Sequence, residues 1–288
     1  MPGKAEAFRE LLKLMQLETL EVNLFRGESR DIGTERVFGG QVLAQALLAA
    51  CQTVDDRLPH SLHAYFLRAG DPGAPIVYNV DRSRDGRSFS ARRVVAIQHG
   101  RPIFTLAASF QAEEQGLEHQ VDMPEVSAPE DSAPLMLLSE DELEQLPETV
   151  HRWLDRFGPF EVRTAIEAGP DAADPRAPVN NLWFKLHGKV GPDQRLNRAV
   201  LAYLSDFHLI GTATLPHGIS WEKPDVMIAS LDHAMWFHRD CRLDDWLLYA
   251  CDSPNTSGGR GLARGMIFDR AGKLLASTAQ EGVIRMKK

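Results

Sequence analysis

The sequence has few of the features that mark secreted, membrane or metal-binding proteins. Its three cysteines, Cys51, Cys241 and Cys251, are too widely spaced to match a metal-binding motif. No apolar run approaches the length that a membrane-spanning helix needs. The first residues, MPGKAEAFREL, lack the basic-then-apolar pattern of a signal peptide, and the last residues are not a Ser-Lys-Leu address. We therefore expect reduced cysteines, no metal site, no membrane span and a cytoplasmic location.

The charge and composition exclude further classes. The formal net charge of the 288 residues is -8, which disfavours a nucleic-acid partner. Hydrophobic residues make up 43% and charged residues 25%, as in an ordinary globular protein. The length suits one large domain or two modules of roughly 100 to 150 residues each.

One carboxylate lies in a very apolar stretch of the chain. Residues 195–211, RLNRAVLAYLSDFHLIG, read as a buried helix that is apolar on nearly every face, with Asp206 near its end. Burying an unpaired carboxylate is costly, so we expect Asp206 to have either partners or a chemical role. The alternative is an Asp in the last helical turn that faces solvent.

The first half of the chain reads as helices followed by antiparallel strands. An amphipathic helix is expected at 5–16, a strand at 20–26, and a buried helix after the glycine pair of FGGQ at 38–41. Four strands with short, glycine-marked connections are then expected at 62–68, 75–82, 88–98 and 102–111. Such a meander is antiparallel and would curl around the buried helix. The glycine pair either brings backbone N–H groups close to a developing negative charge or forms a simple turn.

An acidic stretch separates the two halves. Residues 113–148 carry many acids, no Lys or Arg, and prolines at 124, 129 and 134, which is typical of a partly ordered linker. A short helix is expected at 150–157 and a strand at 182–187. The expected division is a first module at 1–112, a linker at 113–158 and a second module at 159–288.

The second half repeats the first. The matching segments are AR at 91–92 and 263–264, glycine at 100 and 272, and VLA at 42–44 and 200–202. The first two matches share one constant offset, and all of them occur in the same order of helix and then strands. The sequence therefore predicts a duplicated α+β module.

Five segments occur in an order that is typical of one enzyme family. They are FGGQ (38–41), RDGRSFSARRV (84–94), ASFQ (108–111), SLDHAMWFHR (230–239) and ASTAQEG (276–282). Together they resemble the acyl-CoA thioesterase II family, from near Phe8 to the C-terminus. The resemblance implies a double hot-dog fold, in which each half is a curved antiparallel sheet wrapped around a long helix. It also implies hydrolysis of fatty acyl-CoA to free acid and coenzyme A, without a metal or organic cofactor.

The resemblance also implies a catalytic set. The family uses an Asp on the second hot-dog helix, a Thr or Ser at a strand start and a Gln on the last strand, which fall on Asp206, Ser230 and Gln280. We expect Asp206 to accept the proton of an attacking water that Ser230 and Gln280 hold by hydrogen bonds. Backbone N–H groups of Gly40 or Gln41 are the expected oxyanion donors. A covalent route through Ser230 is disfavoured because the chain has no G-x-S-x-G elbow.

The densest basic stretch offers a candidate for coenzyme A binding. It contains Arg84, Arg87 and Arg92, whose guanidinium groups suit the phosphates of coenzyme A. The alternative is that these are solvated charges at a strand edge.

Two other functions remain open. A hot-dog enoyl-CoA hydratase would need a working Asp/His pair; Asp55 and His60 have that spacing but not the surrounding signature. A non-catalytic acyl-CoA-binding protein would tolerate the loss of Asp206.

His63 and His233 are expected to make local hydrogen bonds instead of binding metal, since no third ligand is evident. Hot-dog modules associate through sheet edges, so a homo-dimer or homo-tetramer is expected by analogy.

Overall fold

The structure of the protein is a computed structural model that carries side chains. It describes residues 3–32, 36–135, 158–165, 175–219 and 226–286.

The first half contains two helices and six strands within the described residues. Helix α1 (Lys4–Leu14), hairpin strands β1 (Glu18–Glu21) and β2 (Leu24–Gly27), and helix α2 (Gly39–Cys51) come first. They are followed by β3 (Leu58–Phe66), β4 (Ile76–Asp85), β5 (Phe89–Gln98) and β6 (Arg101–Gln111). The expected single strand at 20–26 is wrong, because the chain turns back at Val22 and Asn23 and forms two short paired strands.

The second half has the same plan. Its elements are β7 (Ala133–Pro134), β8 (Phe160–Thr164), β9 (Val179–Leu186), α5 (Gln194–Ser205), the 3-10 helix η1 (Ile210–His217), β10 (Val226–Ser230), β11 (Asp232–Phe237), β12 (Leu247–Ser257), β13 (Arg260–Asp269) and β14 (Leu274–Met286). The strand expected at 182–187 is therefore confirmed as part of β9. The helix expected at 150–157 lies outside the described residues.

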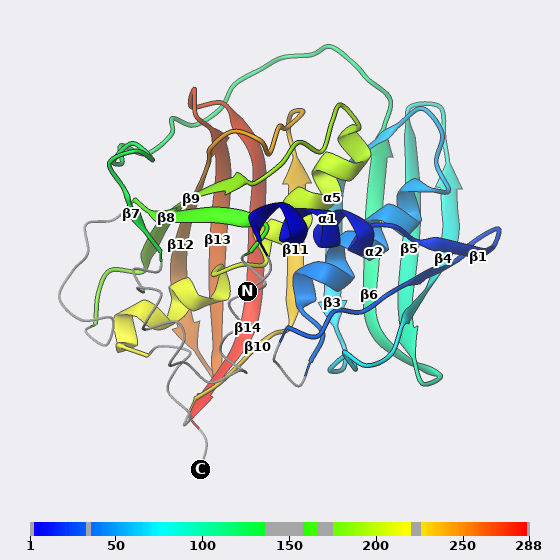
Figure 1. Ribbon diagram of the computed structural model, residues 1–288, viewed down its shortest axis with the longest axis horizontal. Coiled ribbons are helices and arrows are strands. Elements are labelled where there is room, and N and C mark those ends of the chain that lie inside the picture. The colour runs from blue at the N-terminus through cyan, green and yellow to red at the C-terminus, as the bar shows by residue number, and fades with distance from the viewer. Residues whose placement is uncertain (1–2, 33–35, 136–157, 166–174, 220–225, 287–288) are drawn as a thin grey trace.

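The strands of both halves form one antiparallel sheet (Figure 1). Its order contains β2-β4-β5-β6-β3 from the first half and β9-β12-β13-β14-β11 from the second, which is the same connectivity twice. The halves join where β3 pairs with β11, with His63 opposite Ala234. Helices α2 and α5 pack against each other inside the curve of the sheet. This is the double hot-dog fold, and the expectation is confirmed.

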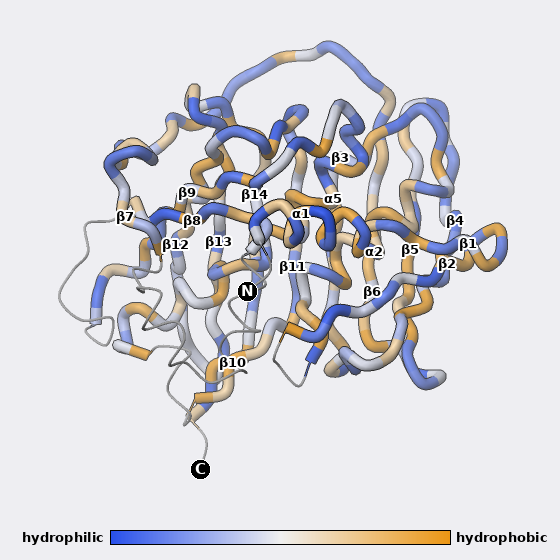
Figure 2. Tube along the Cα trace, in the orientation of Figure 1, coloured by the Kyte–Doolittle hydropathy of each residue, from blue (hydrophilic) through white to orange (hydrophobic). Residues whose placement is uncertain are grey.

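Both central helices are buried over most of their length. Figure 2 shows them as mostly hydrophobic segments in the middle of the molecule. In α2 the run from Gly40 to Leu47 is buried throughout, and in α5 the run from Asn197 to Ser205 is buried. The buried amide of Gln45 is satisfied by Leu14 O (2.7 Å) and by Tyr78 Oη (2.7 Å). A helix without a polar face has no other stable place in a soluble fold.

The described part of the linker is packed onto the second half. Met123 and Val126 contact a buried cluster on β9, β12 and β13. Ser127 O accepts a hydrogen bond from Trp183 Nε1 (2.9 Å), and Glu130 pairs with Arg270 (2.8 Å). One acid of this stretch is therefore paired with an arginine of the β13–β14 connection.

In β13 the residues that match β5 in the sequence repeat are shifted by one position from those that match it in the structure. The β5–β6 loop has two residues, His99 and Gly100, both with positive φ (48° and 72°). In the β13–β14 connection Asp269 N donates to Lys273 O (2.9 Å), so three residues, the last of them Gly272 (φ 84°), lie between these partners, one more than in the β5–β6 loop. Because side chains alternate between the faces of a strand, this extra residue reverses which ones point inward. Arg92 is buried and its sequence match Arg264 is exposed, so the two are not structural equivalents.

Candidate active site

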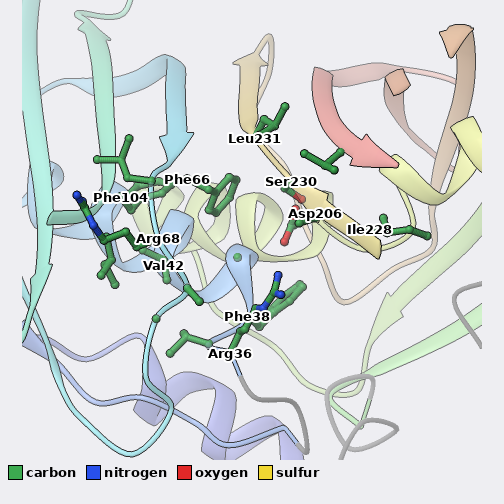
Figure 3. Close-up of a pocket in the computed structure, with 18 of the residues that line it drawn as sticks. Arg36, Phe38, Val42, Phe66, Arg68, Phe104, Asp206, Ile228, Ser230 and Leu231 are labelled. Carbon is green, nitrogen blue, oxygen red and sulfur yellow. The ribbon is translucent and has the colours of Figure 1, made fainter. Parts of the chain in front are cut away.

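A pocket of about 460 Å³ lies where α2 begins and α5 ends. Its walls are the first residues of α2, the chain after β3, the end of β10 and Asp206. Phe38, just before α2, stacks on Phe207, just after α5, with ring centroids 4.8 Å apart. This contact joins the N-terminus of one helix to the C-terminus of the other. In Figure 3 the side chains of Asp206 and Ser230 point toward each other inside the pocket.

Asp206 is the residue that ends α5. It has helical dihedral angles, and its side chain is only 6% exposed. The Nε2 atom of Gln280 donates a hydrogen bond of 2.7 Å to Asp206 Oδ1. A negative charge is unfavourable beside the carbonyl end of a helix, so helix stability alone does not explain a carboxylate here. Its burial in the pocket wall and its bond to Gln280 are what a catalytic base would need.

Gln280 has one amide atom without a partner among the described residues. Its side chain comes from the inner face of β14 and is fully buried. The Nε2 atom donates to both Asp206 Oδ1 (2.7 Å) and His233 Nδ1 (3.1 Å), whereas Oε1 is buried and accepts no hydrogen bond there. A buried amide oxygen normally has a donor. The arrangement therefore suits a donor such as a substrate-side water.

His233 fixes the orientation of that amide. It is fully buried, and burial lowers the pKa of its imidazole from 6.5 to about 3, so the ring is neutral at physiological pH. Since Nδ1 accepts from Gln280, the ring proton lies on Nε2, which donates to Ser205 Oγ (3.0 Å). Local hydrogen bonds were expected for His233, but its contact with Gln280 was not.

Ser205 belongs to a wider network under the site. Its Oγ donates to Ala202 O (2.9 Å), and its carbonyl oxygen accepts from Tyr249 Oη (2.8 Å). Tyr249 Oη also lies 2.8 Å from Thr278 Oγ1. The last turn of α5 is thus tied to β12 and β14, which holds Asp206 in place from behind.

Ser230 completes the predicted group. It is the last residue of β10, pairs with Gly282 of β14, is half-buried and lines the pocket. The structure thus places Asp206, Ser230 and Gln280 together, although they are far apart in the sequence. Their chemical roles remain predictions.

The glycine pair lets the two helices meet at this point. A Cβ atom on Gly39 would lie 2.7 Å from Asp206 Oδ2, and one on Gly40 would lie 2.4 Å from Tyr203 O. Both contacts are closer than a real Cβ atom allows, so the close approach requires glycine. Of the two readings of this pair, close backbone approach is the one that the geometry favours.

The two oxyanion candidates differ. The N–H of Gln41 donates to Phe38 O (3.1 Å), and its side chain bonds Glu28 O (3.1 Å), so Gln41 is engaged within the protein. This contradicts its expected role. Gly40 lies in the first turn of α2, where N–H groups have no acceptor inside the helix, and it remains a candidate.

Arg92 does not have the predicted position for a phosphate ligand. It is 2% exposed and donates to Thr53 Oγ1 (2.8 Å), Thr53 O (2.9 Å) and Asp85 Oδ1 (2.7 Å). Its guanidinium group therefore joins β4 and β5 to the end of α2. The prediction that it binds coenzyme A is corrected: Arg92 is a buried structural arginine.

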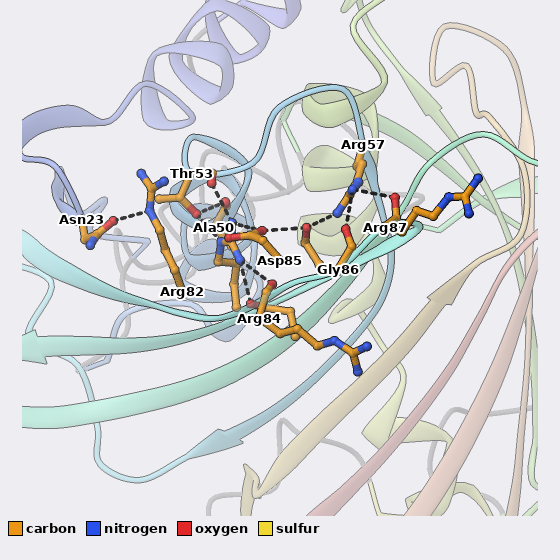
Figure 4. Close-up of polar contacts among 12 residues, drawn as sticks. Asn23, Ala50, Thr53, Arg57, Arg82, Arg84, Asp85, Gly86 and Arg87 are labelled. Carbon is orange, nitrogen blue, oxygen red and sulfur yellow. Dashed lines mark hydrogen bonds and ion pairs between the residues drawn. The ribbon is translucent and has the colours of Figure 1, made fainter.

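Arg84 and Arg87 are exposed but distant from the pocket. They flank the β4–β5 hairpin, whose carbonyls at Gly86 and Arg87 accept hydrogen bonds from Arg57, just beyond α2 (2.7 and 2.9 Å). In Figure 4 their guanidinium groups point away from Thr53 at this end. The pocket is at the other end of α2, and a helix of 13 residues is about 20 Å long. The arginines that line the pocket are Arg36 and Arg68, which density of charge along the sequence did not reveal.

The described residues offer little for other chemistries. None of their His, Cys, Asp and Glu side chains form a group of three that could hold a metal ion. The alternative hydratase pair was Asp55 and His60. Its histidine is engaged elsewhere, because His60 Nε2 is hydrogen-bonded to Ser109 Oγ (2.8 Å) at the end of β3 that lies away from the pocket. No helix among the described residues is long and apolar enough to cross a membrane.

Comparisons with known proteins agree with this geometry. A family model described as "Acyl-CoA thioesterase" matches residues 159–283, and another, "Acyl-CoA thioesterase N-terminal domain", matches residues 26–111. The chain is 44% identical to acyl-CoA thioesterase 2 of Haemophilus influenzae, over 98% of this chain and 99% of that protein. It is 40% identical to human acyl-coenzyme A thioesterase 8, over 95% and 88% of the two chains. A crystal structure of an acyl-CoA thioesterase II from Mycobacterium marinum superposes with a TM-score of 0.80 at 38% identity, covering 96% and 98%.

Proposed function

This chain belongs to the acyl-CoA thioesterase II family, and we propose that it hydrolyses fatty acyl-CoA thioesters by water attack in the pocket beside Asp206. The products are the free fatty acid and coenzyme A. The observation that carries the mechanism is the Gln280 amide, which is bonded to Asp206 through nitrogen and leaves a buried oxygen unpaired within the described residues.

The attacking water is held by three groups. It donates one hydrogen bond to Asp206 and is oriented by Ser230 Oγ, both of which line the pocket, and we assign its second hydrogen bond to Gln280 Oε1, which is buried beside Asp206. Asp206 takes the proton as the water oxygen bonds to the thioester carbonyl carbon. Positioned proton transfer of this kind contributes about 10²- to 10⁴-fold in rate.

The N-terminus of α2 stabilises the negative charge that forms on the carbonyl oxygen. Gly40 lies in the first turn of α2, so its N–H and the positive end of the helix dipole are the donors that we assign to this charge. When the tetrahedral intermediate collapses, its C–S bond breaks, and the leaving thiolate of coenzyme A takes the proton from Asp206. Asp206 is thereby returned to its starting state.

A covalent route through Ser230 has less support. A serine nucleophile needs an adjacent base, and His233 has both ring nitrogens engaged, by Gln280 and by Ser205. Water attack uses the groups that the pocket already brings together.

We also propose the finer organisation of the protein. The two modules are 1–112 and 159–288, joined by 113–158, and the separate family matches support this division. The protein acts in the cytoplasm as a homo-dimer or homo-tetramer, built by further association of sheet edges.

The test is thiol release from acyl-CoA substrates of increasing chain length. Wild type should release thiol, and Asp206→Asn, a nearly isosteric change, should lose about 10²- to 10⁴-fold in kcat. Asp81→Asn, an exposed carboxylate on β4, is the matched control and should keep full activity. Binding of acyl-CoA by wild type without thiol release at any chain length would overturn the proposal and favour a binding protein.

A further inference from the structure

A second hollow adjoins the catalytic pocket, and we propose that it binds the phosphates of the coenzyme A nucleotide through Arg68 and Arg101. The hollow measures about 370 Å³. The inference rests on the proposed function, because it assigns a place to the part of the substrate that does not react.

The two hollows share a wall. Arg68, Ala69 and Ile103 line both the catalytic pocket and the second hollow, so one passes directly into the other. Asp206 and Ser230 lie in the first, and Arg101 lies in the second. Figure 3 shows Arg68 across the pocket from Ser230, beyond the ring of Phe66. A long ligand with its thioester at Asp206 can therefore extend past Arg68 into the second hollow.

The two arginines are held in fixed relation to each other. Gln98, which is 5% exposed, donates to Asp71 O (2.9 Å) and Ala74 O (2.8 Å) and accepts from Asp71 N (2.8 Å). These bonds tie the segment after β3, which carries Arg68, to the end of β5. Arg101 pairs with Gln98 across the two-residue loop. The base of the hollow is thus formed by the buried Gln98 side chain and its hydrogen bonds to the backbone of Asp71 and Ala74.

Both guanidinium groups have donors to spare. Arg68 Nη1 donates to Pro102 O (2.6 Å), which leaves most of its five N–H donors for a ligand. No acid among the described residues forms an ion pair with Arg68 or Arg101, whereas Arg92 and Arg198 each pair with an aspartate. Arginine suits phosphate because its planar group donates two parallel hydrogen bonds.

One acid lines the hollow, and it is already engaged. Asp71 Oδ2 accepts from His99 Nε2 (2.8 Å), and Oδ1 accepts from Gly73 N (2.8 Å). The hydrogen bond from His99, with that from Gly73, lowers the pKa of Asp71, so this carboxylate is ionised at neutral pH. The hollow is lined by two arginines and by one carboxylate that already has hydrogen-bond partners. It is therefore locally positive, although the formal net charge of the chain is -8. A nucleotide with a diphosphate and a third phosphate is attracted to such a locally positive site.

The experiment compares two substrates that differ only beyond the thioester. One is acyl-CoA, and the other is the same acyl group on N-acetylcysteamine, which ends before the phosphates. The variants are Arg68→Gln, Arg101→Gln and the double variant; Arg93→Gln, an exposed arginine on the outer face of β5, is the matched control. We expect KM for acyl-CoA to rise about tenfold for each arginine, with kcat nearly unchanged. Values for the N-acetylcysteamine thioester and for the control should not change.

Three results would overturn the inference. One is an unchanged KM for acyl-CoA in the double variant, and another is an equal rise for both substrates. The third is a rise caused by Arg84→Gln or Arg87→Gln instead, which would return the phosphates to the other end of α2. If wild type hydrolyses neither thioester, the proposed function fails; calorimetry with free coenzyme A on wild type and the double variant then still decides the phosphate site.

Discussion

The buried imidazole of His233 should make the protein less stable as the pH falls below 6.5. Burial lowers the pKa of His233 from 6.5 to about 3. The unfolded chain therefore binds a proton between these two pH values that the folded chain does not bind. Stability from this residue is complete above pH 6.5 and is lost progressively as the pH falls toward 3.

The size of the effect follows from the shift. Each pH unit in this window removes about 1.4 kcal/mol from the free energy of unfolding, so acidification from pH 8 to pH 5 costs roughly 2 kcal/mol through His233. Protonation cannot be relieved by solvent, because the side chain is fully buried. Its neighbours are the Gln280 amide, the Ser205 hydroxyl and, 4.0 Å from Nδ1, the Asp206 carboxylate.

The assay is urea unfolding of wild type and His233→Asn at pH 8, 6.5 and 5. The Asn amide can accept from Gln280 in place of Nδ1, but it does not titrate. Other groups that titrate in this range, including His60, His187 and His238, are common to both proteins and cancel in the difference. The stability advantage of wild type should shrink by about 2 kcal/mol from pH 8 to pH 5. If the free energy of unfolding of the two proteins falls by the same amount from pH 8 to pH 5, the reasoning is refuted.

Three further changes test the site and its supports. Gly39→Ala places a Cβ 2.7 Å from Asp206 Oδ2 and 2.9 Å from Phe66 Cε1, so the Asp206 side chain must shift and kcat should fall by about tenfold or more. Arg92→Leu leaves Thr53 O without its donor and should lower the free energy of unfolding by about 2 kcal/mol, but KM for acyl-CoA at low temperature should not change. His233→Leu removes the acceptor that orients the Gln280 amide, so it should lower kcat by about tenfold at unchanged KM, whereas His233→Asn should retain most of the activity.

The parts of the fold that could be predicted are those whose signals are local. The run after Gly40 is apolar except for Gln41 and Gln45, and a helix enclosed on most sides is the structure that buries it. Strands β4, β5 and β6 were each bounded by glycine turns and were located to within a few residues. The two short strands at 18–27 were missed because four-residue strands carry too little alternation to separate from one longer strand.

Charge density along the chain was a poor guide to charge in space. The arginines of the 84–93 stretch alternate between strand faces, so Arg92 points inward beside Ser90 and Val94 while Arg93 is exposed. That alternation was visible in the sequence and could have marked Arg92 as buried. Arg68, by contrast, follows β3 and Arg101 begins β6, and the pairing of these two strands brings them to one hollow.

The proposed catalytic group could be named only through resemblance to a family. Asp206, Ser230 and Gln280 come from a helix end and two strands, and their proximity depends on the pairing of β10 with β14 and on the packing of α5. No spacing rule on one sequence encodes such contacts. The role of His233 was missed for the same reason, since its partner Gln280 is far away along the chain.

A doubled module with antiparallel central helices has two places where a helix N-terminus meets the end of its partner. At one of them Gly39 of α2 contacts Asp206 of α5. At the other, where α5 begins and α2 ends, Arg195 donates to Cys51 O (3.4 Å) and buried Arg198 donates to Pro59 O (2.8 Å). Guanidinium groups therefore fill the second junction and join the halves there.

The sheet residues next to the two junctions also differ. Ala108 on β6 and Gln280 on β14 both face the core in equivalent strands, but only Gln280 has an amide that can bond a carboxylate and hold a water. The second half thus supplies Asp206, Ser230 and Gln280, while the first supplies the N-terminus of α2 and the arginines beside the pocket. Each half contributes what the other lacks, so one complete site arises only when both are joined across β3 and β11. The two equivalent junctions of the duplicated chain therefore differ: one holds the proposed catalytic group, and at the other guanidinium groups join the halves.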